Sequence, residues 1–430
     1  MHVRAMALLA IVTLAGAACQ DLFNVESPLN VPATDLNDPT LAPLLVTSAV
    51  GDFECAFGDY VSDAANITDE YTASVAVAGN NLWDLRGPAA MNTYGAQGQS
   101  CAILQTSPTG QIYAPLQAAR YQADDTYARI QNWVAVGDSI PPPGKTVFLS
   151  ILAAYSGFAY TLFGEGFCQS AFELGPPLRS SDVFAIAEQR FTTVLSLDTV
   201  PGDSLRSMAL LGRARVRLDL GRLSDADADA KLVPLNFVKN ATYSSDSPRR
   251  LNQAYAWNAG TGYASVDPRF RNLTVGAVPD PRVKVLDSGH NGQDSRTRLW
   301  TATKYATQAS SIPLATWDEA QLIIAEAEGG QGAVDAINRL RTKYGLPLFA
   351  STDSATIAQQ VAEERRRTLF LDGHRLGDFL RDNIPDSLQF DQGANAKGQP
   401  YGIMTCFPLP LVETGNNPHC AAGQCNATTR

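Results

Sequence analysis

Apolar residues along the chain recur mainly at the three- and four-residue spacing of amphipathic helices. One such stripe consists of Tyr113, Leu116, Arg120, Ala123, Tyr127, Ile130 and Trp133. A second stripe runs from Val147 to Leu162 and is separated from the first by Pro141-Pro142-Pro143-Gly144. Proline removes a backbone donor and ends a helix, so this run predicts a stop between two helices. The pattern predicts a mainly α protein.

Two stretches predict pairs of antiparallel helices. The first contains helices over 183–197, 203–220 and 224–234, with Gly221 as a C-cap. The second contains helices over 317–328 and 333–343, which end at Gly329-Gly330 and at Gly345. Small residues occur where the helices of a pair would touch, as in tetratricopeptide repeats. We therefore expect tetratricopeptide-like helical pairs.

Long irregular segments interrupt this helical pattern. Residues 79–111 are rich in Gly, Asn and Gln, and residues 235–312 combine loops with a few short β-like stretches. Segments of this length are uncommon as plain connections in a compact domain. Binding residues concentrate on loops that a rigid scaffold positions. The sequence therefore predicts one α-helical domain over 42–430, with loop insertions at about 79–111 and 235–312.

The amino terminus has the features of a targeting segment. Arg4 precedes 14 uncharged residues at 5–18, which are too few to span a bilayer, and small residues then lead directly to Cys19. This end resembles a bacterial lipobox, in which the cysteine thiol is lipidated. We expect a signal peptide at 1–18 and a lipidated tether at 19–41, anchored to the membrane by acyl chains. The alternative is an ordinary signal peptide with a structural Cys19.

Composition narrows the class of partner and the redox environment. The 430-residue chain is 45% hydrophobic and has a net charge of −10, so nucleic acid is excluded as a partner because phosphate binding needs a basic surface. An exported chain with six further cysteines favours disulfides, and Cys420 and Cys425 are close enough in sequence to staple the tail. The other four are Cys55, Cys101, Cys168 and Cys406. A zinc site is the alternative, but Cys-x2-Cys does not occur, and we expect no metal.

Three segments in the last third carry a family resemblance. Residues 317–327 read Trp-Asp-Glu-Ala-Gln-Leu-Ile-Ile-Ala-Glu-Ala, and residues 336–347 contain Ala-Ile-Asn-Arg-Leu-Arg. Residues 363–381 read Glu-Glu-Arg-Arg-Arg-Thr-Leu-Phe-Leu-Asp-Gly-His-Arg-Leu-Gly-Asp-Phe-Leu-Arg. In this order they resemble the SusD/RagB-like family of outer-membrane nutrient-binding lipoproteins. Phe163-Gly164-Glu165-Gly166, Asp267-Pro268-Arg269 and the segment 407–418 agree with that resemblance.

The resemblance implies a function at the cell surface. It implies a lipid-anchored outer-membrane protein that captures oligosaccharides or other nutrients and delivers them to a TonB-dependent, SusC-like transporter. It implies neither catalysis nor a cofactor. Two alternatives stay open: a helical-repeat scaffold that binds only protein, and a secreted carbohydrate-active enzyme. Sequence motifs of hydrolases, nucleotide-binding loops and zinc proteases do not occur.

The charged residues near the C-terminus predict a structural ion-pair network. Asp372, Arg375, Asp378 and Arg381 step by three, which would align alternating charges on one helical face. Glu364 and Arg365 belong to the same network. Opposite charges keep carboxylates ionised, whereas a catalytic acid needs a raised pKa. His374 and Asp378 have the spacing of two metal ligands, but a third histidine is not near.

Loop aromatics beside amide and charged side chains are the candidate ligand-binding residues, because sugar C–H groups stack on rings and hydroxyls bond to polar groups. Asn81, Trp83, Asp84 and Arg86 fit this description best. The other candidates are Tyr94, Trp257, Tyr263 and Trp300. The alternative for each ring is that it packs inside the protein.

Overall fold

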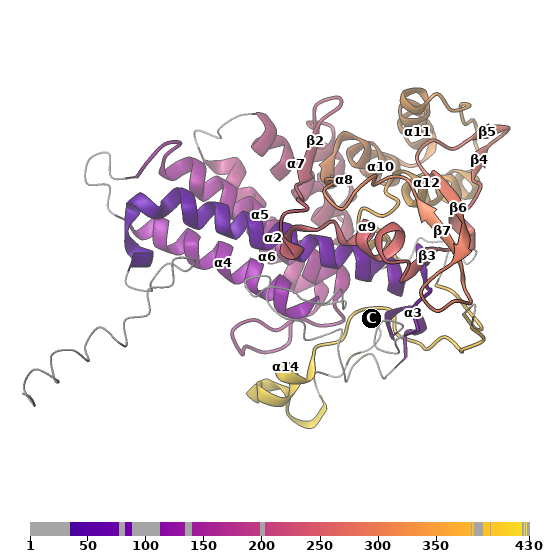
Figure 1. Cartoon of the computed structure of the whole chain (residues 1–430). Helices are drawn as coiled ribbons and strands as arrows, with labels where there is room; N and C mark the ends of the chain where they lie inside the picture. The colour runs from indigo at the N-terminus through magenta and orange to yellow at the C-terminus, as the bar shows by residue number, and fades with distance from the viewer. Residues whose placement is uncertain are drawn as a thin grey trace, which may run out of the picture.

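The fold is described here from a computed structural model. It covers residues 35–76, 82–87, 112–133, 140–197, 203–379, 381, 390–395, 397–423, 425 and 427. Helices fill most of the body and the strands are short (Figure 1). The prediction of a mainly α fold with tetratricopeptide-like pairs and a few strands is confirmed.

Long helices in the first half form one bundle. They are α2 (Ala42–Ile67), α4 (Tyr113–Asn132), α5 (Lys145–Gly166) and α6 (Ser180–Ser196). Helix α5 packs against α2, α4 and α6, and its residues from Ala153 through Gly166 are all buried. Within the described residues, two stretches are long and apolar enough to cross a bilayer, Pro39–Ile67 and Lys145–Gly166. Most of each is buried among other helices, as in a core helix.

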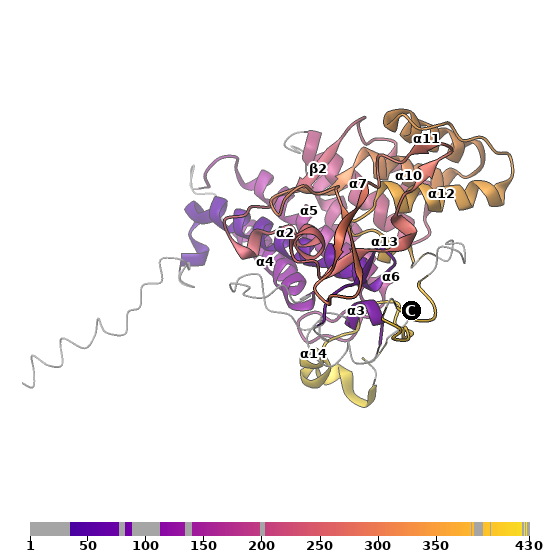
Figure 2. The ribbon, with the colours of Figure 1, turned by 45° about the vertical axis from the view of Figure 1, so that its right-hand side comes forward.

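The predicted helical pairs stack on one another beside this bundle. They consist of α7 (Asp203–Asp219), α8 (Leu223–Ala230), α10 (Trp317–Glu328) and α11 (Gly330–Tyr344), while the helix predicted over 183–197 is α6 of the bundle. A further helix, α12 (Ser354–Thr368), packs against α10 and α11. Helix α10 contacts α7, α8, α11 and α12, and Figure 2 shows α10, α11 and α12 side by side. Gly212 of α7 lies against Phe191 of α6, where a Cβ would come within 2.4 Å of the ring. Gly345 ends α11 with a φ of +66°, which glycine adopts without steric cost.

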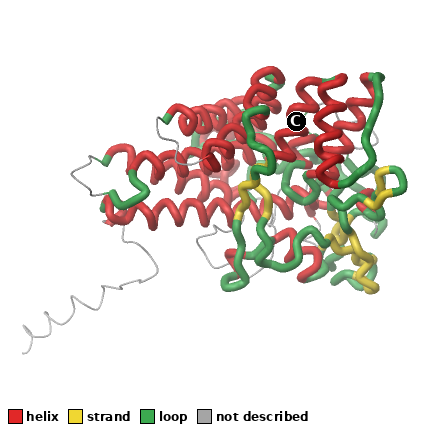
Figure 3. The backbone as a smooth tube through the Cα atoms, turned by 90° about the horizontal axis from the view of Figure 1, so that it is seen from above, coloured by secondary structure: helices red, strands yellow, loops and turns green. Residues whose placement is uncertain are grey.

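The segments between the helices contain four antiparallel strand pairs. They are β1 (Tyr71–Ala73) with β3 (Ala264–Val266), β2 (Val238–Ala241) with β8 (Ile312–Thr316), β4 (Thr274–Val275) with β5 (Val278–Pro279), and β6 (Val285–Asn291) with β7 (Arg298–Ala302). The short helices are α3 (Leu82–Leu85), α9 (Gln253–Tyr255), α13 (Arg375–Asp378) and α14 (Leu411–Asn416). Figure 3 shows most strands gathered on one side of the helical body.

Aromatic side chains dominate the core where the bundle meets the C-terminal segment. Phe158 packs edge-on against Phe191 at 5.0 Å, and Phe167 lies 5.6 Å from Phe407. Buried aromatic pairs of this kind add to the stabilisation that their apolar area supplies. The same region is cross-linked by the disulfide Cys168–Cys406.

A second disulfide closes the tail. Cys420 pairs with Cys425, as their spacing predicted. Cys19 and Cys101 lie outside the described residues.

Candidate functional site

A cleft of about 500 Å³ opens where β1, β3 and the β6–β7 hairpin meet residues 391–401. We call it the polar cleft. Its lining residues are Thr72, Asp267, Pro268, Arg269, Arg271, Arg296, Thr297, Arg298, Asp391, Gln392, Ala394, Asn395 and Tyr401. In Figure 1 this region lies at the end of the molecule where β3, β6, β7 and α3 come together.

The Asp267-Pro268-Arg269 sequence builds one wall of the polar cleft. The Asp267 carboxylate accepts a hydrogen bond of 2.9 Å from the Arg269 backbone N–H and caps a 3₁₀ helix over Pro268–Phe270. Aspartate at this position satisfies an N–H that would otherwise lack a partner. Phe270 is fully buried and stacks on Phe370 with 4.8 Å between ring centroids. The buried ring between them fixes the backbone from which Arg269 and Arg271 reach the cleft.

Several carboxylates in and around the polar cleft pair with one arginine. Arg269 pairs with Asp391, and with Asp267 and Asp69 at 3.4 Å each. Burial raises the pKa of Asp267 to about 6, and the nearby charge of Asp391 acts in the same direction. The two lining carboxylates therefore share one guanidinium.

The other arginines that line the cleft are Arg271, Arg296 and Arg298. Arg298 pairs with Asp287 across β6 and β7 at 2.7 Å. Arg271 donates from Nε to the Val266 carbonyl at 2.8 Å and lies 5.0 Å above the Trp300 ring. Among the residues that the structure describes, Arg271 and Arg296 form no ion pair.

Predicted residues at 84 and 86 lie directly behind the cleft. Asp84 is buried, and its carboxylate accepts a hydrogen bond of 3.3 Å from the Asn395 amide. Burial raises the pKa of Asp84 to about 7. The Arg86 guanidinium lies 5.2 Å from the ring centre of Tyr401 and 5.0 Å from that of Phe390. Both residues support the lining side chains Asn395 and Tyr401 from the protein side.

The predicted ring aromatics lie in different environments. Trp83 is 4% exposed and packs edge-on against Phe407 at 4.8 Å, so its faces are not open to a ligand. Trp257 is 3% exposed and contacts the half-buried Tyr263 edge-on at 5.9 Å. Trp300 is half-buried beneath Arg271, next to the cleft. Trp83 and Trp257 are buried because removing their large apolar rings from water is favourable.

Two further predicted residues, Asn81 and Tyr94, lie outside the described residues. The sequence patterns did not identify the side chains that line the cleft, above all Arg269, Arg271, Asp391 and Tyr401. Asp267-Pro268-Arg269 and the pair Arg296 and Arg298 were the available signals. They are polar clusters in a long insertion, but their shared cleft depends on residues 391–401, far along the chain.

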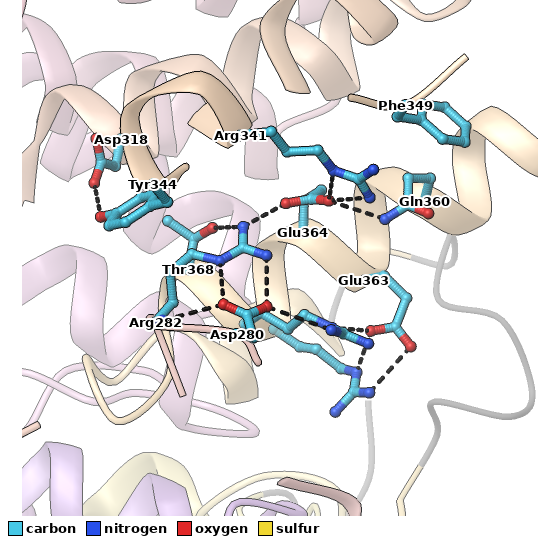
Figure 4. Close-up of polar contacts among 12 residues, drawn as sticks. Asp280, Arg282, Asp318, Arg341, Tyr344, Phe349, Gln360, Glu363, Glu364 and Thr368 are labelled. Carbon is cyan, nitrogen blue, oxygen red and sulfur yellow. Dashed lines mark hydrogen bonds and ion pairs between the residues drawn. The ribbon is translucent and has the colours of Figure 1, made fainter. Parts of the chain in front are cut away.

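The C-terminal charges form ion pairs with distant partners. Glu364 accepts hydrogen bonds from Arg282, from Arg341 at 2.8 Å and from Gln360 at 2.9 Å (Figure 4). Arg282 also pairs with Asp280 at 2.7 Å, so the segment 280–282 meets helices α11 and α12 here. Removing one member of such a buried set would leave an uncompensated charge.

The remaining predicted charges pair in the same way, but not along one helical face. Arg365 and Arg381 both bind Asp378 at 2.6 Å. Arg375 binds Asp69 at 2.7 Å, and Lys304 binds Asp372 at 2.7 Å. The single helical face expected for residues 372–381 is wrong, because α12 ends at Thr368 and α13 spans only Arg375–Asp378. Leu371 with a φ of +59° lies in the turn between them.

A smaller cavity of about 330 Å³ lies among α10, α11, α12 and α13. Ile357, Val361 and Ala362 line its apolar side, and Arg365, Arg381 and Asp378 line its polar side. The charged groups on this polar side already bind one another. The polar cleft is therefore the better candidate for a ligand with many hydroxyl groups.

Comparison with known proteins gives matches among solved structures. No family model matches the chain, and no curated protein matches it. A SusD-like carbohydrate-binding protein from Bacteroides vulgatus superposes with a TM-score of 0.65 at 13% identity, over 91% of this chain and 99% of that one. The surface glycan-binding protein A from Bacteroides uniformis gives a TM-score of 0.61 at 13% identity, over 89% and 99%. A laminarin-binding SusD-like protein gives 0.56 at 15% identity, over 87% and 97%.

These superpositions cover nearly the whole of each related structure, so they include the helical pairs and the loop-rich segments alike. The resemblance predicted from the C-terminal segments is confirmed at the level of the fold. The chain has the SusD-like fold.

Proposed function

We propose that this protein binds oligosaccharides in the polar cleft at the cell surface. It delivers them to a TonB-dependent, SusC-like transporter of the outer membrane. An acyl group on Cys19 holds it at that membrane. The protein binds and hands over its ligand without changing it chemically.

The lining of the polar cleft carries this proposal. Guanidinium, carboxylate, amide and hydroxyl groups converge there on a rigid support, and sugar hydroxyls need such a mixture of donors and acceptors. Tyr401 supplies the aromatic ring of the lining, held by Arg86 behind it. The proteins with the same fold are named as carbohydrate-, laminarin- and glycan-binding, which supports a saccharide ligand.

The lipobox-like end supports anchoring and delivery. Small residues run directly into Cys19, as lipidation requires. A lipid anchor keeps the protein beside its transporter without a membrane-spanning segment of its own. The SusD-like fold supports the same role.

Titration of the purified chain with a panel of oligosaccharides tests the binding site. We expect Tyr401→Ala to weaken binding about two- to tenfold, since an aromatic contact contributes about 0.5–1.5 kcal/mol. Tyr121→Ala is the matched control, because Tyr121 is 52% exposed and does not line the cleft. Equal affinity of the two variants would refute the cleft as the site. Release of shorter sugars during titration would favour the enzyme alternative.

Anchoring and delivery need a cellular test. We expect radiolabelled palmitate to label the wild-type protein and not the Cys19→Ala variant. Loss of the gene should reduce uptake of the bound oligosaccharide, and a β-barrel transporter should copurify with the wild-type protein. A protein that copurifies with a partner but binds no saccharide would support the scaffold alternative.

A further inference from the structure

We infer that the polar cleft selects acidic glycans, meaning oligosaccharides that carry carboxylate or sulfate groups. This inference rests on the proposed function and specifies its class of ligand. It starts from the charge of the cleft. The whole chain has a net charge of −10, whereas the cleft is lined by four arginines and two aspartates. The side chains that line the cleft therefore carry a net positive charge, opposite in sign to that of the whole chain.

The pairing of these arginines leaves positive charge without a counterion. Arg269 and Arg298 are held by carboxylates of the protein. Within the part of the chain that the structure describes, Arg271 and Arg296 have no such partner. Asp267 and Asp287 act on the Arg271 charge from nearby, but neither forms an ion pair with it.

Arg271 has a fixed orientation that suits an anion. Its Nε–H donates to the Val266 carbonyl, and its guanidinium carbon lies 5.0 Å from the ring centre of the half-buried Trp300. The two terminal nitrogens are left to reach the cleft that this residue lines. Partial burial lowers the pKa of Arg271, which means that the surroundings disfavour its charge. An anionic group of the ligand would compensate that charge, whereas a neutral hydroxyl would not.

The geometry of a guanidinium matches the ligand groups that carry such a charge. Two parallel N–H donors bind a carboxylate or a sulfate through two oxygens at once. Arg296 is exposed and lines the same cleft, so it offers a second positive group for another acidic sugar of the oligosaccharide. Tyr401, Asn395 and Gln392 also line the cleft and would contact the hydroxyl groups of the ligand. Uronic acid chains and sulfated glycans both present this chemistry.

Calorimetric titration distinguishes acidic from neutral ligands. The probes are oligogalacturonides, the same oligosaccharides with their carboxyl groups reduced to alcohols, and chondroitin sulfate oligosaccharides. We expect at least one acidic probe to bind at least tenfold more tightly than the reduced, neutral probe at low ionic strength. Added salt should weaken acidic binding, because the attraction is electrostatic. The carboxylate and the sulfate arms identify which anion is preferred.

Variants assign the preference to Arg271. Arg271→Gln should weaken acidic binding about tenfold and leave binding of the neutral probe unchanged, and Arg271→Lys should fall between, because lysine keeps the charge but loses the two-donor geometry. Arg206→Gln is the control, since Arg206 is exposed on α7 and does not line the cleft. If the Arg271 variants do not fold, the affinity of Arg296→Gln for the acidic and neutral probes tests the inference independently.

The outcomes separate this inference from the proposed function. Neutral oligosaccharides that bind as tightly as acidic ones would overturn the inference and leave the proposed function standing. The same holds if neither Arg271→Gln nor Arg296→Gln changes acidic binding. Absence of binding to every acidic and neutral probe would overturn both.

Discussion

Removing the disulfide between Cys168 and Cys406 should destabilise the protein much more than removing the one between Cys420 and Cys425. The first links residues 238 positions apart and the second links residues 5 positions apart. A cross-link stabilises mainly by restricting the unfolded chain, and the effect grows with the logarithm of the closed loop. The loop-entropy relation gives roughly 5.5 kcal/mol for the long loop and roughly 2 kcal/mol for the short one at 25 °C.

These energies translate into melting temperatures. A chain of 430 residues unfolds with an entropy of about 0.9 kcal/mol/K, at about 2.1 cal/mol/K per residue. The Cys168→Ala/Cys406→Ala variant should therefore melt about 6 °C below the wild type. The Cys420→Ala/Cys425→Ala variant, which removes the same number of sulfur atoms, should melt about 2 °C below it.

Calorimetry on the oxidised proteins, with free thiols titrated beforehand, measures this difference. The folded structure around the long-range disulfide has other support, because the Cys168 backbone N–H binds the Phe407 carbonyl at 2.9 Å and the Phe407 N–H binds the Gly166 carbonyl at 2.8 Å. The variant should therefore fold and be measurable. Equal losses in both variants, or a larger loss for the tail disulfide, would refute the loop-entropy reasoning.

Three further predictions concern buried side chains and are checked by urea unfolding. Burial raises the pKa of Glu70 to about 8, so its carboxyl is protonated in the folded protein and ionised in the unfolded one between about pH 5 and pH 8. The free energy of unfolding should therefore fall by up to about 1.4 kcal/mol per pH unit as the pH rises through that window. Glu70→Gln should remove this part of the pH dependence; an unchanged pH dependence would contradict the assignment. Trp83→Ala should cost about 3–5 kcal/mol because the ring is buried against Phe407, whereas an exposed ring would leave stability within about 0.5 kcal/mol. Arg215→Met should cost about 3–5 kcal/mol by leaving the buried Glu319 without its two-point partner, and adding Glu319→Leu should recover part of that loss; a double variant less stable than the single one would argue against it.

The helices could be predicted closely because their signals are local. The stripe at 113–133 became α4, Tyr113–Asn132, and the predicted helix at 317–328 became α10 with the same bounds. A helix repeats every 3.6 residues, so its buried face is visible within a short window. The end of α11 could also be predicted locally, because Gly345 adopts the left-handed conformation that ends a helix.

The candidate site could be predicted only in part. Asp84 and Arg86 do lie beside the polar cleft, but as buried supports of Asn395 and Tyr401. Trp83 stands between the polar residues Asn81 and Asp84, which made it a candidate for ligand binding. The ring is instead buried by Phe407, a partner more than 300 residues later in the chain. No local pattern identifies such a partner.

The amino-acid sequence by itself determined the helices, their caps, the helical pairs and the resemblance that named the fold, because each depends on residues within a few turns of one another. Only the tertiary structure decided the site. The polar cleft joins Thr72, Arg269 and Arg271, the hairpin arginines and Tyr401, which meet solely because the strand pairs and the C-terminal segment pack on one end of the helical body. Which arginine of the cleft pairs with a carboxylate depends on distances of a few ångströms between these segments. Those distances are set by packing between segments far apart in the chain, so they produce no repeating pattern in the sequence.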